Sequence, residues 1–175
     1  MDISKNFFEF FGLPVSFQID QTLLSERYRE LQKQLHPDRH AHLSDREQRL
    51  SVQYTAHLNE GMATLKSPLR RAQYLLLIEG IDTTGESSVK IDPMFLMQQM
   101  ELRERLEDAR DAADPFAELE SLGEEVQSEL AGLRRQFDQC YLSKALEEAA
   151  AVVRKMQFLE KLLLEIENLE DQLED

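Results

Sequence analysis

The densest group of reactive side chains in the sequence is the run His36-Pro37-Asp38-Arg39, which His40 and His42 follow closely. Neutral imidazole is a common zinc ligand, so these three histidines are candidates for metal binding. A zinc site also needs a fourth ligand and a fixed geometry, and we therefore predict no metal site here. The plainer interpretation is a helix stop and a turn, because Pro37 lacks an N–H and restricts the residue before it.

The sequence also lacks the residues that other kinds of catalysis require. The single cysteine, Cys140, cannot form an internal disulfide, and alone it cannot hold a zinc ion or an iron–sulfur cluster. Such a cysteine is more often a small buried hydrophobe than a nucleophile. The sequence shows no Ser-His-Asp pattern, no Gly-rich phosphate loop and no Cys-x-x-Cys pair. We therefore predict that the protein is not an enzyme and binds no cofactor.

Two predicted helices flank the His-Pro-Asp run. The first spans about Gln21 to Leu35, with Asp20 as its N-cap. Its apolar stripe, at 4-3-4 spacing, consists of Leu24, Tyr28, Leu31 and Leu35. The basic residues that lie off this stripe, and should therefore face water, are Arg27, Arg29 and Lys33. Ser44 and Glu47 form a capping box that opens the second helix, to about Leu65, and the two helices should pack antiparallel.

Two shorter helices complete the first half of the chain. The residues Asn6 to Phe11 include four phenylalanines and are ended by Gly12-Leu13-Pro14, which predicts a short helix docked into a small core. Ser67-Pro68 supplies an N-cap with proline at the first helical position, and the helix that it opens should end near Gly80. The inner residues expected of that helix are Ala72, Leu75, Leu76 and Ile78.

The second half predicts three longer helices. Residues 80–91 are polar and loop-like, Asp92-Pro93 and Asp114-Pro115 repeat the cap-then-proline start, and Ser143 is the candidate cap of the last helix. The last helix carries an apolar seam: Val152, Met156, Leu159, Leu163, Ile166, Leu169 and Leu173. We therefore predict an all-α protein, with residues 1–76 as one domain, 77–87 as a linker, and 88–175 as an antiparallel three-helix bundle or short coiled coil.

The formal charge of −14 is unevenly divided, with a net +1 in residues 1–78 and −15 in residues 79–175. This asymmetry indicates two regions with different partners and argues against nucleic acid, which requires a basic face. No apolar run approaches the roughly 20 residues that span a bilayer, and no signal peptide is visible. Together with the single cysteine, these features predict a cytoplasmic protein without membrane contact.

The predicted helix that begins at Pro93 carries apolar residues on two faces. On a wheel of about 100° per residue, its inner stripe consists of Phe95, Leu102, Leu106 and Ala109. Its outer face consists of Leu96, Met97 and Met100, continued by the acidic Glu101, Glu104 and Asp108. Phe158 of the last helix lies about a quarter turn from the seam of that helix. An apolar outer face is a candidate partner site, and the alternative is that it packs between the bundle and the first domain.

Spaced motifs in both halves together resemble one known family. The first half contains Tyr28-Arg29-x-Leu31-x5-His36-Pro37-Asp38 and Asn59-Glu60-Gly61-x-x-Thr64-Leu65-x-x-Pro68-x-x-Arg71-Ala72-x-Tyr74-Leu75-Leu76. The second half contains Phe95-Leu96-Met97-x-x-Met100-Glu101-Leu102-Arg103-Glu104 and Val153-Arg154-Lys155-Met156-x-Phe158-Leu159-x-Lys161-Leu162. The first half resembles a J-domain. The whole set, which spans nearly the entire chain, resembles the bacterial HscB family of J-type co-chaperones in iron–sulfur cluster assembly.

The resemblance implies a co-chaperone that stimulates the ATPase of an HscA/DnaK-type chaperone and delivers the iron–sulfur scaffold protein IscU to it. The residues that it implies in chaperone binding are His36, Pro37, Asp38, Arg39, Arg27, Arg29 and Lys33. Basic residues there would steer the encounter with an acidic chaperone surface. The residues that it implies in scaffold binding are Leu96, Met97, Met100, Glu101, Glu104, Asp108 and Phe158.

Two alternatives remain at this point. The protein could serve a general DnaK-type chaperone with other clients, or it could be a helical structural protein in which His-Pro-Asp is only a turn. One position departs from the family pattern, because Gly61 stands where a J-domain usually has alanine. Glycine in a helix interior costs about 1 kcal/mol relative to alanine, so we expect a loosened helix there.

Overall fold

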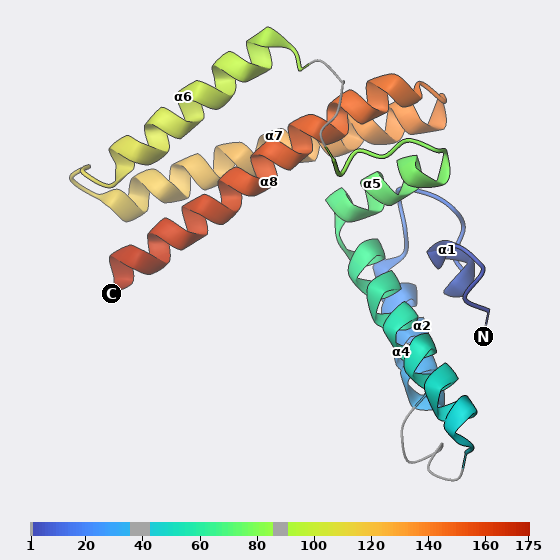
Figure 1. Ribbon diagram of the computed structural model, residues 1–175. Coiled ribbons are helices and arrows are strands. Elements are labelled where there is room, and N and C mark those ends of the chain that lie inside the picture. The colour runs from blue at the N-terminus through green and yellow to red at the C-terminus, as the bar shows by residue number, and fades with distance from the viewer. Residues whose placement is uncertain (1, 36–42, 86–90) are drawn as a thin grey trace. The chain divides into compact units, whose positions relative to one another are not determined.

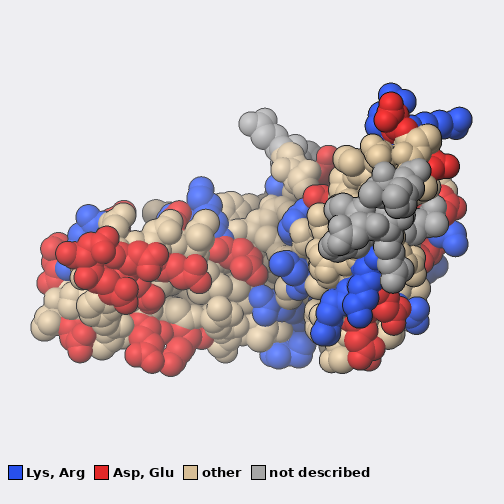
Figure 2. Space-filling model, turned by 90° about the horizontal axis from the view of Figure 1, so that it is seen from below, with Lys and Arg blue, Asp and Glu red and all other residues tan. Residues whose placement is uncertain are grey.

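The computed structural model describes residues 2–35, 43–85 and 91–175, and every regular element within these ranges is an α-helix (Figure 1). The helices are α1 (Phe7–Phe10), α2 (Gln21–Gln34), α4 (Asp45–Lys66), α5 (Pro68–Ile78), α6 (Pro93–Ala109), α7 (Pro115–Leu142) and α8 (Leu146–Glu174). The chain divides into two compact units, Met1–Glu79 and Gly80–Asp175, and Figure 2 shows Asp and Glu side chains gathered on the second. The predicted all-α class is confirmed, and none of the described helices has the length and hydropathy needed to cross a membrane.

Local side-chain caps begin most of these helices where the sequence predicts. The Asp20 carboxylate accepts from the N–H of Leu23 at 3.0 Å, and Ser44 and Glu47 form the expected capping box of α4. Ser67 accepts from the N–H of Arg70 at 3.2 Å, with proline at the first position of α5. Each cap satisfies an amide that the helix leaves unpaired and contributes about 1 kcal/mol.

In the first unit, α2 and α4 lie side by side as an antiparallel pair (Figure 1). Leu24 of α2 and Leu58 and Leu65 of α4 are fully buried between them and their neighbours. The Tyr28 hydroxyl donates to Asn59 Oδ1 at 2.8 Å and links the two helices on their outer side. Burial of each leucine contributes roughly 2 kcal/mol, so the pair holds α2 in a fixed orientation.

The short helix α1 docks against α4 at Gly61. A β-carbon on Gly61 would lie 2.9 Å from ring atoms of both Phe7 and Phe11. The glycine therefore leaves room for two aromatic rings against the backbone of α4, which gives a packing reason for its presence. The ring of His57, one turn earlier, lies 4.9 Å from the Phe7 ring and 4.8 Å from the Phe10 ring, measured between centroids.

A buried arginine ties the loop before α2 to the end of α4. Arg71 is 6% exposed, and its Nε donates to the Phe17 carbonyl at 2.6 Å. Its Nη1 donates to the Leu65 carbonyl at 2.6 Å, and the guanidinium carbon lies 4.9 Å from the Phe17 ring centroid. A buried charge is tolerated when its donors are paired in this way, so Arg71 joins three segments that are distant in sequence.

In the second unit, α7 and α8 form a long antiparallel hairpin, and α6 packs along it (Figure 1). The buried residues of α8 include five members of the predicted seam, Val152, Met156, Leu159, Ile166 and Leu169. The inner stripe predicted for α6 is also found, since Phe95, Leu102 and Ala109 are buried. This seam positions α6 so that its opposite face points away from the hairpin.

Three details differ from the sequence expectation. Ser143 does not cap α8 but is the C-cap of α7, because Lys144 turns the chain in the left-handed region (φ 61°) and α8 starts only at Leu146. Ile78 is 40% exposed rather than buried, because it lies at the end of α5. Within the predicted linker, Thr83 is buried and its carbonyl accepts from Gln157 of α8, so residues 80–85 pack onto the second unit.

Candidate functional site

The first candidate face is the basic side of α2. Arg29 and Lys33 are exposed and one helical turn apart, so they lie on the same side of the helix. They border a groove of about 400 Å³ between α2 and α4, whose other lining residues are Gln32, Leu35, Thr55, Leu58 and Asn59. Arg27 lies elsewhere on α2, with its guanidinium carbon 3.9 Å from the position that a β-carbon on Gly12 would occupy.

The other four residues predicted to bind the chaperone, His36, Pro37, Asp38 and Arg39, lie outside the described residues, as do His40 and His42. The structure therefore brings Arg29 and Lys33 together, places Arg27 apart from them, and leaves the His-Pro-Asp run as a prediction. Among the residues that are described, no group of three His, Cys, Asp or Glu side chains could hold a metal ion.

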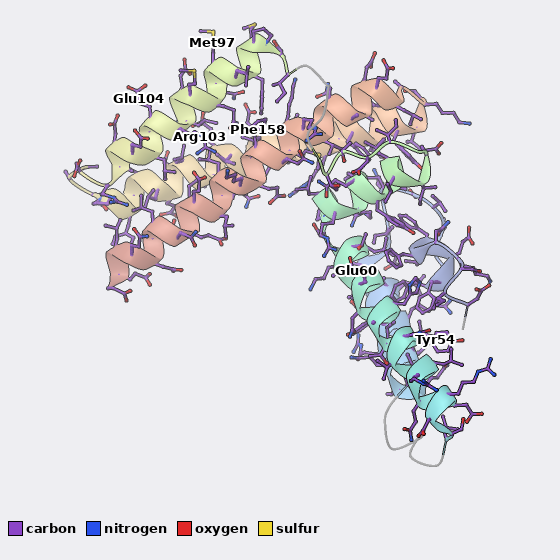
Figure 3. The ribbon with its side chains drawn as sticks, in the orientation of Figure 1. Tyr54, Glu60, Met97, Arg103, Glu104 and Phe158 are labelled. Atoms are coloured by element: carbon purple, nitrogen blue, oxygen red, sulfur yellow. The ribbon has the colours of Figure 1, made fainter. Side chains whose placement is uncertain are left out.

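The second candidate face is the outer side of α6. Leu96, Met97 and Met100 are 43%, 64% and 71% exposed, and the predicted acidic residues Glu101, Glu104 and Asp108 are exposed as well. Figure 3 shows Met97 and Glu104 pointing away from α7 and α8. A contiguous exposed apolar surface of this kind is a candidate interaction site.

Residues seven apart lie on nearly the same line along a helix, which orders this face into rows. One outer row runs from Met94 through Glu101 to Asp108. The next rows run from Met97 to Glu104 and from Met100 to Glu107. Each outer row therefore begins with methionine and continues with a carboxylate, so α6 offers an apolar beginning and an acidic end.

Polar contacts hold the two flanks of α6 to the hairpin. On one flank Arg103 pairs with Glu165 of α8 at 2.8 Å, and Arg110 donates to Gln172 of α8 at 3.3 Å. On the other flank Gln98 donates to Glu129, and Arg105 pairs with Glu125, both of α7. These pairs are partly exposed, so each contributes less than about 1 kcal/mol, and they serve chiefly to fix the rotation of α6.

Phe158 differs from the other predicted scaffold residues because it is half-buried. Its ring lies on α8 at 6.2 Å from the Phe95 ring, centroid to centroid, and Figure 3 shows it on the side of α8 that faces α6. Leu96 heads the row of Arg103 and Arg110, so it lies on the α8 flank, near this ring. The structure thus places Phe158 at the edge of the exposed patch and Leu96, Met97 and Met100 on it.

Sequence reasoning missed Met94, which at 77% is the most exposed of the large apolar side chains in the described residues. Its position on the wheel, in the row of Glu101 and Asp108, was a signal that could have identified it. A second missed feature is Gln99, which is 5% exposed and whose amide oxygen and nitrogen both lack a partner within the described structure.

Cys140 is poorly suited to nucleophilic chemistry. Burial, and then the negative charge of Glu148, raise the pKa of its thiol above the ordinary value. Reactive cysteines have a lowered pKa, whereas Cys140 has a raised one and is half-buried rather than fully buried.

The chain matches known proteins along nearly its whole length. It is 46% identical to a co-chaperone protein HscB homolog from Shewanella loihica over 171 residues, which cover 96% of this chain and 99% of that protein. It is 47% identical to the corresponding homolog from Aliivibrio salmonicida, with 96% and 98% covered. The chain belongs to the HscB family of co-chaperones. The sequence model of the HSCB C-terminal oligomerisation domain matches residues 91–167, which hold α6, α7 and most of α8.

Solved HscB structures have the same fold. Chaperone HscB from Vibrio cholerae is 43% identical, with a TM-score of 0.86 over 97% of this chain and 99% of that one. Human co-chaperone HscB is 25% identical, with a TM-score of 0.88 over 97% and 84%. The yeast co-chaperone Jac1 follows at 26% identity and a TM-score of 0.72. The predicted family and the predicted arrangement of an N-terminal J-domain and a C-terminal helical domain are confirmed.

Proposed function

We propose that this HscB-family protein stimulates the ATPase of an HscA/DnaK-type chaperone and delivers the iron–sulfur scaffold protein IscU to it. The observation that carries the proposal is the apolar outer face of α6, in a chain that belongs to the HscB family of co-chaperones. The bacterial relatives support a bacterial cytoplasmic setting. The chain itself contributes binding and positioning, and ATP hydrolysis takes place on the chaperone.

The chaperone contact would combine the His36-Pro37-Asp38 run with the basic side of α2. Arg29 and Lys33 lie on one side of a helix that the α2–α4 pair holds in place. Positive charge on a rigid helix speeds the encounter with an acidic surface and orients it, and such an effect weakens with salt. This supports a docking role for α2.

The scaffold contact would use Leu96, Met97, Met100 and Phe158, with Glu101, Glu104 and Asp108 around them. The exposed methionines suit a protein partner because the side chain is flexible and polarizable. The carboxylates that continue each row would face basic residues of the scaffold. Burial of three or four such side chains is enough for a specific complex of moderate affinity.

Single-turnover ATP hydrolysis by the HscA-type chaperone tests the first half of the proposal. We expect the full chain to stimulate hydrolysis and His36→Gln to abolish the stimulation. Reversal of charge at Arg29 and Lys33 should weaken stimulation, more at low salt than at high salt. The matched control reverses Arg46 and Arg49, which are exposed on α4 and change the net charge of the unit equally. Equal loss in both variants would contradict docking through α2.

Titration with the purified scaffold tests the second half. The triple change Leu96→Ala, Met97→Ala and Phe158→Ala should weaken scaffold binding roughly 100-fold or more, since each of the three side chains loses about 1 kcal/mol or more of burial. The same variant should retain basal ATPase stimulation. Stimulation of a DnaK-type chaperone without any scaffold binding would instead favour the general J-protein with other clients.

A further inference from the structure

The apolar outer face of α6 extends past the residues discussed as the scaffold patch. Met94 is 77% exposed and heads the row that continues with Glu101 and Asp108. Its backbone N–H is held by the Asp92 carboxylate at 3.0 Å, so the first turn that carries it is fixed by the helix cap. Core packing does not account for a large apolar side chain that is this exposed, so a partner contact is the better explanation for Met94.

A groove opens next to Met94, on the flank of α6 that faces α7. It holds about 530 Å³, and its lining consists of Asp92, Met94, Phe95, Met97, Gln98, Glu101, Glu129, Leu133 and Lys155. Met97 thus belongs both to the scaffold patch and to the groove. The two form one continuous surface that crosses α6 from the α8 flank to the α7 flank.

The walls of this groove are held in place before any partner arrives. Phe95 is 6% exposed, and the centroid of its ring lies 6.2 Å from the centroid of the Phe158 ring. The Lys155 ammonium lies 5.5 Å from the centroid of the Phe95 ring. Gln98 donates to Glu129 and fixes α6 against α7 at the groove. A preformed pocket with an apolar wall of Met94, Phe95, Met97 and Leu133 loses little entropy when a side chain enters it, which favours binding there.

The charges around the groove determine what it accepts. Three carboxylates, Asp92, Glu101 and Glu129, line it against the single ammonium of Lys155. A partner residue with a carboxylate would meet this excess negative charge, whereas a lysine or arginine beside an apolar residue would be attracted.

We propose that the scaffold partner inserts an apolar side chain, flanked in its own sequence by Lys or Arg, into this groove, with Met94 as a contact residue. The inference rests on the proposed function, because the occupant is the same scaffold. It adds a second contact, on the α7 flank, which the residues predicted from the sequence do not include. Specificity then comes from the groove, and the outer patch supplies general apolar contact.

Methionine methyl NMR on the full chain tests this directly. The chain has six methionines, and they differ in environment: Met94, Met97 and Met100 are exposed, whereas Met156 is buried. With ¹³C-methyl-methionine labelling and assignment by single substitution, we expect unlabelled scaffold to shift the signals of Met94, Met97 and Met100. The signal of Met156 should remain in place as the internal control.

The outcomes separate this inference from the function on which it rests. Shifts at Met97 and Met100 without a shift at Met94 would overturn the groove and leave the proposed function standing. An absence of any shift at saturating scaffold would overturn both. Shifts at all three, with Met156 unmoved, support both.

Affinity measurements supply a second readout. Met94→Ala should weaken scaffold binding about fivefold, the scale of losing partial burial of one methionine. Leu164→Ala is the matched control, since Leu164 is 56% exposed on α8 and lies outside the groove lining. This variant should bind the scaffold with the affinity of the unaltered chain. Met94→Lys should lose more affinity than Met94→Glu at equal helicity, because the incoming residues are basic. The reverse order would overturn the proposed charge of the partner.

Discussion

Among its described residues, each unit buries one large polar side chain, and the two differ in their hydrogen bonding. Arg71 in the first unit is 6% exposed, and it donates to the carbonyls of Phe17 and Leu65. Gln99 in the second unit is 5% exposed, yet neither its oxygen nor its nitrogen has a partner among the described residues. A paired buried polar group fixes a conformation, whereas an unpaired one weakens the packing around it.

This difference indicates how each unit presents its working face. The first unit joins distant segments through a few specific residues, so the basic side of α2 is held in one position. The second unit relies on a repeated seam, and the unpaired amide of Gln99 lies on the inner side of α6, the helix that carries the apolar patch. The polar pairs on both flanks of α6 hold the helix to the hairpin.

The largest expected effect is the loss of Arg71. Arg71→Leu leaves two buried carbonyls unpaired and should lower the free energy of unfolding of the first unit by about 3 kcal/mol. Arg70→Leu is the matched control, because Arg70 pairs with Glu60 while 45% exposed and should cost less than about 1 kcal/mol. Urea unfolding followed by tyrosine fluorescence reports on this unit, which holds three of the four tyrosines. An equal loss of unfolding free energy in the two variants would contradict the claim that the buried hydrogen bonds of Arg71 stabilise the first unit more than an exposed ion pair does.

Gly61→Ala should destabilise the first unit by about 1–2 kcal/mol, although alanine is the better helix former. The reason is the 2.9 Å approach of the new β-carbon to the rings of Phe7 and Phe11, which have to shift. Gly123→Ala, also within a helix but with no atom within 4 Å of the new β-carbon, should instead stabilise the protein by about 0.5–1 kcal/mol. The two midpoints in urea should move in opposite directions, and movement in the same direction would contradict this account.

Gln99→Leu should stabilise the second unit by about 1 kcal/mol, because an apolar side chain removes the unpaired amide. Thermal unfolding monitored by far-ultraviolet circular dichroism measures the gain. Gln98→Leu is the comparison, since Gln98 has a partner in Glu129 and its loss should yield no gain. Scaffold binding should stay unchanged in Gln99→Leu, because the side chain lies on the buried side of α6 and the outer face is kept.

The smallest effect concerns pH. Burial between the rings of Phe7 and Phe10 lowers the pKa of His57 below its ordinary value of 6.5. Above that value the ring of His57 is neutral in both the folded and the unfolded state, so its protonation takes nothing from the free energy of unfolding. As pH falls from 6.5 toward the folded-state pKa, only the unfolded state takes up the proton, and stability is lost. Unfolding of His57→Phe should lack this component between pH 7 and 5, and identical pH profiles would refute it.

Local signals in the sequence predicted most of the fold. Asp20, Ser44 with Glu47, and Ser67 were identified because a cap acts on amides two or three residues away. Ser143 was assigned to the wrong helix because the turn between α7 and α8 is short, so a serine there can lie at the end of one helix or at the start of the next. The left-handed backbone of Lys144 ends α7 at this point and makes Ser143 its C-cap. The outer face of α6 followed from helical periodicity.

Contacts between distant segments could not be predicted in the same way. The burial of Arg71 depends on the carbonyl of Phe17, 54 residues away, and no spacing rule connects them. The place of Met94 depends on which flank of α6 meets α7, and the pairs Gln98–Glu129 and Arg105–Glu125 reveal that flank. The roles of His36, Pro37 and Asp38 stay predictions that the ATPase assay tests.

The contact of Gly61 with Phe7 and Phe11 also orders the substitutions that the chain can accept in evolution. Alanine at position 61 fits better beside smaller side chains at positions 7 and 11, because the new β-carbon and both rings occupy the same space. Either change made alone costs stability, since alanine crowds the rings and a smaller ring leaves a gap against Gly61. Relatives with alanine at this position should consequently differ at one of the two aromatic positions, a pairwise dependence that an alignment of the family can test.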